Sequence, residues 1–183
     1  MKITTNAIEG VYVIEPNVFG DDRGYFMESY SKAALAELGI TNDFVQDNEA
    51  FSTKGVLRGL HYQCGVHAQA KLVRVIQGEV LDVIVDVRPD STTYGKHFSV
   101  RLSGENKKQM LVPRGMAHGY IVLSDTATFV YKCDNGYNKE SEGGLLYNDP
   151  KLGIDWILDP ATFKVSEKDL IQPTFGDHKP INL

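Results

Sequence analysis

The sequence contains only two cysteines, Cys64 and Cys133, among its 183 residues, which excludes the disulfide framework of a small secreted protein. It has no apolar run near the ~18 residues that a membrane helix needs, and its first residues lack the apolar stretch of a signal peptide. Basic residues number 19 against 24 acidic ones, and the net charge of −5 argues against a nucleic-acid-binding surface. We therefore expect a cytoplasmic protein with reduced thiols, without a membrane segment or a nucleic-acid partner.

The sequence is rich instead in short segments that alternate apolar and polar residues and contain many β-branched side chains. These segments are Val11–Glu15, Gly24–Tyr30, Val56–Gln63, Lys71–Gln77, Glu79–Arg88, His97–Leu102, Gly119–Leu123 and Thr126–Cys133. Turn residues separate them, as in Gln77-Gly78-Glu79 and the Pro-Asp turn at 88–91. The pattern favours a mainly β jelly-roll sandwich or barrel over alternating strands and helices, folded as a single domain over residues 1–183.

Helix is a minor part of the predicted structure. The segment Lys32–Leu38 is rich in Ala, Leu and Glu, with Ser31 as its N-cap and Gly39 at its end. A second helix is predicted to begin at Ser166, because Ser166-Glu167-Lys168-Asp169 resembles a capping box with Asp in place of Glu.

Two strand-like segments carry side chains suited to chemistry. The run from Gly55 to Gln63 includes Arg58 and His61, and a Pro-x-Gly turn precedes His118 at the mouth of a later strand. Imidazole titrates near neutrality and is the commonest general base, so two histidines at two strand edges predict one concave site. Because Arg58 and His61 are three apart, a regular strand would turn them to opposite faces, and a bulge at Gly59 would let both serve one pocket.

Other interpretations remain open at this point. A metal site is the main competitor, although no second histidine or carboxylate follows His61 at ligand spacing. Tyr131 shares a strand face with Phe129, so it is either a core residue or, if it reaches the cavity of His61, an acid that complements that base.

A set of motifs resembles the dTDP-4-dehydrorhamnose 3,5-epimerase family, in order and over nearly the whole chain. The motifs are Asp22–Glu28, Gln46-Asp47-Asn48, Gly55–Gln63, Lys71-Leu72-Val73, Val112–Gly119, Tyr131-Lys132, Tyr137, Glu142-Gly143-Gly144 and Asn148-Asp149-Pro150. The resemblance implies a cupin-type jelly-roll β-barrel with a few short helices, and a homodimer. It also implies a dTDP-sugar isomerase that uses no metal or other cofactor and acts between a dehydratase and a reductase in dTDP-L-rhamnose synthesis.

The resemblance also implies a role for each matching residue. His61 is similar to the family's general base, Tyr131 to its acid and Asp169 to the carboxylate partner of the histidine. The implied substrate-binding positions are Arg23, Glu28, Gln46, Asn48, Arg58, Lys71, His118, Glu142 and Lys168, with Tyr137 stacking on the thymine. The chemistry agrees, because deprotonation beside a ketone gives an enolate, which needs a base at carbon and a cation such as Lys71 at oxygen.

Three alternatives stay open from the sequence. A related epimerase could invert only C3 of the sugar, a jelly roll could bind nucleotide sugars without catalysis, or a cupin enzyme could depend on a metal.

Overall fold

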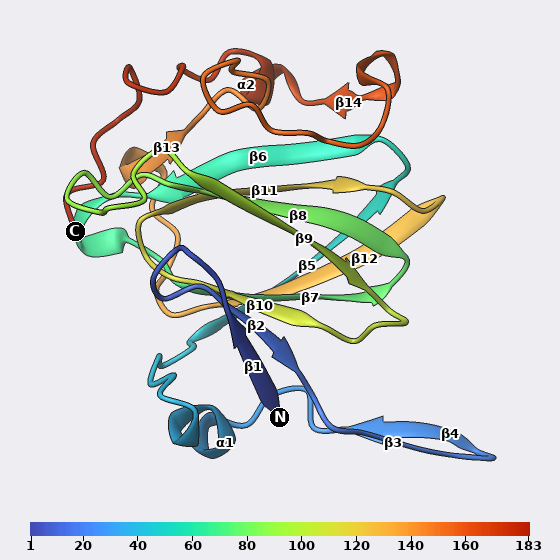
Figure 1. Ribbon diagram of the computed structural model, residues 1–183. Helices are drawn as coiled ribbons and strands as arrows, with labels where there is room; N and C mark the ends of the chain where they lie inside the picture. The colour runs from blue at the N-terminus through green and yellow to red at the C-terminus, as the bar shows by residue number, and fades with distance from the viewer.

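The computed structural model describes residues 1–183 as two β-sheets packed face to face (Figure 1). Sheet I has the strand order β1 (Lys2–Thr5), β2 (Tyr12–Glu15), β10 (Gln109–Val112), β7 (Lys71–Gln77), β12 (Thr126–Cys133) and β5 (Gln46–Thr53). Sheet II has the order β13 (Glu142–Gly144), β6 (Val56–Gln63), β11 (Met116–Val122), β8 (Glu79–Asp86) and β9 (His97–Ser103), and β14 (Lys164–Val165) runs parallel to β6. All other strand pairs are antiparallel, so the predicted mainly β architecture is confirmed.

The core lies between the two sheets. Side chains from both inner faces, including Val73, Ile84, Met110 and Phe129, form one buried cluster. The strands β8 and β11 are buried along almost their whole length, because the C-terminal segment covers the outer face of sheet II with residues such as Trp156. Burial on both faces explains why these two strands have nearly continuous apolar sequences rather than a strict alternation.

The helices are short and lie outside the sandwich. The helix α1 (Lys32–Glu37) covers part of the outer face of sheet I, where Leu35 packs in a cluster with Leu72. Its predicted cap is confirmed, since Ser31 Oγ accepts a hydrogen bond from the Ala34 amide at 3.2 Å. The helix α2 (Glu167–Leu170) lies over sheet II (Figure 1), and three 3₁₀ turns span Gly65–His67, Lys139–Ser141 and Pro160–Thr162.

Several predicted boundaries need correction. β6, β7 and β12 have the predicted bounds, but the strand expected over Gly24–Tyr30 ends at Met27. The strand expected from Glu79 to Arg88 ends at Asp86, and β11 begins at Met116 instead of Gly119. His118 therefore lies inside a strand and not at its mouth. The sequence patterns did not predict β1, β3, β5, β10, β13 and β14.

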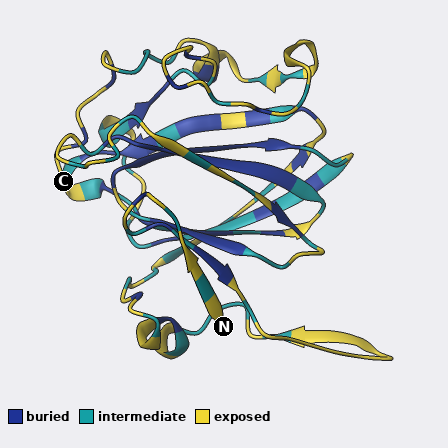
Figure 2. Cartoon of the chain, viewed as in Figure 1, coloured by how far each residue is buried: buried dark blue, intermediate teal, exposed yellow.

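A two-stranded hairpin projects from the body of the protein. It consists of β3 (Val18–Asp21) and β4 (Gly24–Met27), which pair only with each other (Figure 1). Its strands are almost wholly exposed (Figure 2), although they include Phe19 and Phe26, which are 64% and 71% exposed. Neither α1 nor α2 has the length or the apolar character needed to span a membrane.

Candidate active site

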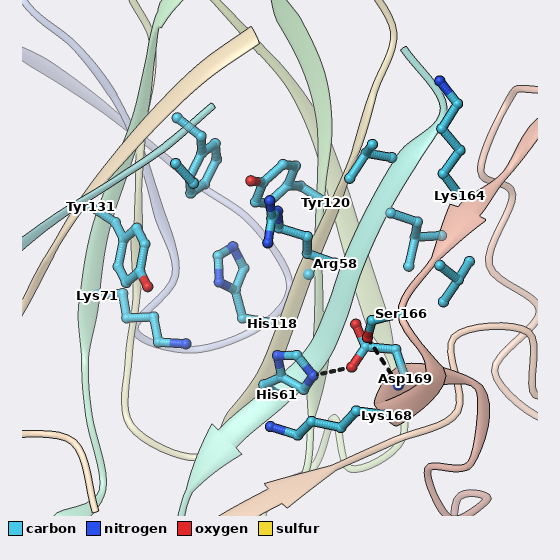
Figure 3. Close-up of a pocket in the computed structure, with 16 residues that line it drawn as sticks. Arg58, His61, Lys71, His118, Tyr120, Tyr131, Lys164, Ser166, Lys168 and Asp169 are labelled. Atoms are coloured by element: carbon cyan, nitrogen blue, oxygen red, sulfur yellow. Dashed lines mark hydrogen bonds and ion pairs between the residues drawn. The ribbon is translucent and has the colours of Figure 1, made fainter. Parts of the chain in front are cut away.

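A cavity of about 560 Å³ opens between the two sheets, and the C-terminal segment closes one side of it (Figure 3). Sheet I contributes Lys71, Phe129 and Tyr131 to its wall, and sheet II contributes Arg58, His61, His118 and Tyr120. The segment around α2 adds Lys164, Ser166, Lys168 and Asp169. His61 and His118 are direct cross-strand partners on β6 and β11, so the structure brings the two predicted histidines together on one cavity.

An irregularity in β6 brings Arg58 and His61 into the same cavity. They are three positions apart on β6, but their partners His118 and Tyr120 are only two positions apart on β11, which marks a β-bulge. Gly59 has φ +121°, and a Cβ added there would lie 2.5 Å from Gly119 Cα. The predicted bulge at Gly59 is therefore confirmed, and only glycine fits this position.

A histidine–carboxylate pair in the cavity joins His61 and Asp169. Nε2 of His61 lies 2.5 Å from Asp169 Oδ1, and the Gly59 amide donates to Asp169 Oδ2 at 3.3 Å. Burial acts to raise the pKa of Asp169, but the hydrogen bond and charge of His61 outweigh it, and the pKa lies below its ordinary value. The carboxylate thus stays ionised and orients the ring, which leaves Nδ1 of His61 without a partner in the chain.

The same arrangement corrects one detail of the predicted capping box. Ser166 Oγ accepts from the Asp169 amide at 3.2 Å, so the cap itself is present. The Asp169 carboxylate does not return to the Ser166 amide, because it is engaged with His61 and Gly59.

Tyr131 and Lys71 face His61 from sheet I (Figure 3). The ammonium of Lys71 lies 6.0 Å from the centre of the Tyr131 ring. Burial raises the pKa of Tyr131, so its hydroxyl retains its proton at neutral pH. Burial lowers the pKa of Lys71, an effect that the nearby carboxylates of Asp82 and Glu142 oppose. A proton donor and a buried lysine therefore lie on the side of the cavity opposite the histidine.

A second histidine–carboxylate pair lies deeper in sheet II. Nε2 of His118 lies 2.9 Å and 3.1 Å from the two carboxylate oxygens of Asp82, which is fully buried. Burial raises the pKa of Asp82, while His118 and Lys71 act to lower it. Sequence reasoning missed Asp82, although a charged residue within Val80-Leu81-Asp82-Val83-Ile84 was an available signal.

An adjoining recess of about 350 Å³ shares His61, Lys71 and Tyr131 with the cavity. The predicted binding residues Gln46, Asn48, Tyr137 and Glu142 line this recess. The Tyr137 hydroxyl donates to Glu142 at 3.2 Å, and Glu142 also forms an ion pair with Lys168 of α2. Polar side chains suited to hydrogen bonding with a nucleoside thus lie beside the reactive cavity.

Two predicted binding residues lie away from both spaces. Arg23 sits at the turn of the β3–β4 hairpin, where its side chain is 85% exposed and pairs with Asp21 at 2.5 Å. Glu28 follows β4 and is also exposed. Within a single chain, neither residue reaches the cavity.

The cavity contains an oriented histidine, a protonated tyrosine on the opposite wall and a buried lysine. These are the groups that an acid–base isomerase needs in order to act beside a carbonyl group. The structure gathers no cluster of three or more His, Cys, Asp or Glu side chains that could hold a metal ion. The fold and site therefore define the class as a jelly-roll epimerase.

Comparison with known proteins identifies the family. A family model described as dTDP-4-dehydrorhamnose 3,5-epimerase matches residues 5–177. The epimerase of that name from Pseudomonas aeruginosa is 51% identical over 178 residues, which cover 97% of each chain. The crystal structure of the epimerase from Elizabethkingia anophelis is 54% identical, with a TM-score of 0.93 and 97% coverage of both chains.

The Legionella pneumophila relative was crystallised with dTDP-4-keto-L-rhamnose, and it is 48% identical with a TM-score of 0.91 over 96% of this chain and 93% of its own. The chain belongs to the dTDP-4-dehydrorhamnose 3,5-epimerase family. It is therefore an isomerase with a cupin-type fold, as the resemblance implied.

Proposed function

We propose that this chain converts dTDP-4-dehydro-6-deoxy-D-glucose to dTDP-4-dehydro-L-rhamnose by inverting C3 and C5, in dTDP-L-rhamnose synthesis. The observation that carries the proposal is the convergence of His61, paired with Asp169, and Tyr131 on one cavity from opposite sheets. The family membership supports the double inversion. The two free thiols support a cytoplasmic location, which remains a proposal.

Deprotonation is assigned to His61. The C3 and C5 hydrogens both flank the C4 ketone, so removal of either one gives an enolate whose charge rests on the C4 oxygen. The free Nδ1 of His61 takes the proton, and Asp169 on Nε2 stabilises the resulting imidazolium. The ammonium of Lys71 stabilises the enolate oxygen, where a positive charge in a buried site is most effective.

Reprotonation is assigned to Tyr131. Inversion requires a proton from the face opposite to the base, and Tyr131 lines the cavity from the other sheet. The raised pKa of Tyr131 supports this role because the hydroxyl carries its proton at neutral pH. One base and one acid can serve both carbons, since C3 and C5 are symmetrically placed about C4.

Substrate binding is assigned to the remaining predicted residues. We place the thymine against Tyr137 and the rest of the nucleoside beside Gln46, Asn48 and Glu142, because these residues line the recess. Lys168 belongs to the same set because it forms an ion pair with Glu142. His118, held by Asp82, contacts the hexose. Arg58 lines the cavity without a carboxylate partner, which suits a clamp on the substrate diphosphate.

Incubation in deuterium oxide tests the function directly. With dTDP-4-dehydro-6-deoxy-D-glucose as substrate, we expect deuterium at both C3 and C5, as detected by NMR and mass spectrometry. Label at C3 alone would establish an enzyme that inverts only C3. A complete lack of exchange would favour a binding module, and activity that a chelator removes and a metal restores would favour a metal-dependent cupin.

We further propose a homodimer in which the β3–β4 hairpin reaches the partner's cleft. An isolated two-stranded hairpin is at best marginally stable in water, and this one exposes Phe19, Tyr25 and Phe26. A second copy that covered the hairpin would bury these rings. The same contact would bring Arg23 and Glu28 to a substrate, which their position in a single chain does not allow.

Mixed dimers test this shared site. We expect the His61→Ala homodimer and the Arg23→Glu homodimer to be impaired. A mixed dimer of one His61→Ala chain and one Arg23→Glu chain, purified through two different tags, should regain about half of wild-type activity, because one of its two sites is intact. The control is a mixed dimer of two differently tagged His61→Ala chains, which should stay inactive. If the His61→Ala and Arg23→Glu pair also stays inactive, or if size-exclusion chromatography with light scattering finds only monomers, the shared-site proposal is wrong.

A further inference from the structure

Ser52 is a buried polar residue in contact with Arg58, and no role has been assigned to it. It lies on the edge strand β5 and is only 5% exposed. Its hydroxyl oxygen accepts a hydrogen bond from Nε of Arg58 at 3.2 Å. The two side chains therefore join the edge strand of sheet I to the bulged strand of sheet II.

This contact fixes the guanidinium of Arg58. Arginine has several rotatable bonds, and an unpaired guanidinium would lose considerable entropy on binding a ligand. A bond at Nε holds the planar group while the terminal nitrogens remain available as donors. The hydroxyl of Ser52 thus prepares Arg58 for a ligand rather than neutralising its charge.

A second donor lies beside Arg58. Tyr120 lines the same cavity, and its hydroxyl is the one buried side-chain polar atom without a hydrogen-bond partner. Its ring stacks on Phe129 at 4.2 Å, and Figure 3 shows the hydroxyl directed toward Arg58. A buried hydroxyl without a hydrogen-bond partner lowers the stability of the fold. The Tyr120 hydroxyl beside the guanidinium of Arg58 therefore indicates that an acceptor oxygen of a ligand binds between them.

We propose that Ser52 is a positioning residue that orients Arg58, so that Arg58 and the Tyr120 hydroxyl together bind an oxygen of the nucleotide sugar. The inference rests on the proposed function and adds this set of three residues to it. The oxygen belongs to the diphosphate or to the hexose, and both are acceptors of the same kind.

Substitution of Ser52 in two backgrounds tests the proposal. We expect Ser52→Ala to lower kcat/KM by about five- to tenfold, the usual effect of losing one hydrogen bond. The same substitution should have no further effect in an Arg58→Lys background, because lysine has no Nε–H to be held. If Ser52→Ala is as active as wild type, or costs the same factor in both backgrounds, Ser52 does not act through Arg58.

The matched control is Ser103→Ala. Ser103 is also a β-strand serine that is 5% exposed, and its hydroxyl accepts a hydrogen bond from the Asn106 amide at 2.9 Å, but it lies outside the cleft. We expect this variant to retain wild-type kcat/KM with a melting temperature close to that of Ser52→Ala. A loss of kcat/KM in Ser103→Ala equal to that of Ser52→Ala would make the effect one of general stability and overturn the proposal.

Binding of dTDP alone, measured by calorimetry, locates the oxygen. Weaker dTDP binding by Ser52→Ala together with lower kcat/KM assigns the contact to the diphosphate, and unchanged dTDP binding with lower kcat/KM assigns it to the hexose. If Ser52→Ala changes neither dTDP binding nor kcat/KM and the wild-type protein is an active epimerase, the inference about Ser52 is refuted and the proposed function is not. Absence of epimerisation by the wild-type protein would instead refute the proposed function.

Discussion

Replacing His61 by Ala should abolish both hydrogen exchange and epimerisation, with a loss of about 10³- to 10⁴-fold or more in kcat. His61 lines the cavity with its Nδ1 unpartnered and a carboxylate oxygen 2.5 Å from its Nε2. His118 is paired with Asp82 in the same way, but its side chain is only 7% exposed against 29% for His61, so His61 is the more accessible base. The measurement is proton NMR of the substrate in deuterium oxide, which follows exchange and product formation in one sample.

His97→Ala provides the matched control, since His97 is an exposed histidine on β9 outside the cleft. It should leave both rates unchanged. Asp169→Asn adds a second check, because it preserves the shape of the side chain but removes the charge that orients His61. It should retain the fold by circular dichroism and lose most of the activity. Normal exchange in a folded His61→Ala protein would exclude this residue as the base.

The parts of the fold that sequence could predict are those whose inner faces are apolar. β7 and β12 direct residues such as Val73, Val75, Ala127 and Phe129 into the inter-sheet cluster, so their alternation is visible and their predicted bounds are correct. Turn residues add to the signal, as at Gly78, whose φ of +79° suits the tight link between β7 and β8.

β5 was missed for a reason that is itself functional. Its inward residues Gln46, Asn48 and Ala50 line the cleft instead of a dry core, and Ser52 bonds to Arg58 of the cavity wall. A strand that lines a polar site has no apolar face, so the hydrophobic period that reveals other strands is absent. The strand that the hydrophobic pattern did not predict is therefore one that forms a wall of the candidate active site.

Sequence reasoning about the site succeeded where the alternation of side chains along a strand imposed a constraint. The three-residue spacing of Arg58 and His61 required an irregularity, and Gly59 was the residue able to supply it. The pairing of His118 with Asp82 depends on the neighbouring register of β8 and β11, which no local pattern reveals. Arg23 lies on the exposed hairpin away from the cavity, and only the proposed contact with a second copy would bring it to a substrate.

Replacing Tyr131 by Phe should separate the two halves of the reaction. Epimerisation should fall by about 10²- to 10³-fold, whereas exchange at C3 and C5 should fall much less. The reason is that His61 can still remove a proton and return a deuteron to the same face, but the hydroxyl that supplies a proton to the other face from sheet I is then missing. The ratio of exchange to inversion, read from NMR spectra of the residual substrate, should therefore rise strongly.

Tyr94→Phe is the control, because Tyr94 packs on Phe175 outside the cleft, and it should leave the ratio unchanged. Phenylalanine keeps the partial packing of residue 131 against the core, so a folding defect is not expected. A parallel fall of exchange and epimerisation in Tyr131→Phe would mean that the hydroxyl assists deprotonation, and the acid would have to be sought elsewhere. Lys71 would then be the first candidate, because it lies on the same wall and its burial lowers the pKa of its ammonium, which makes proton donation easier.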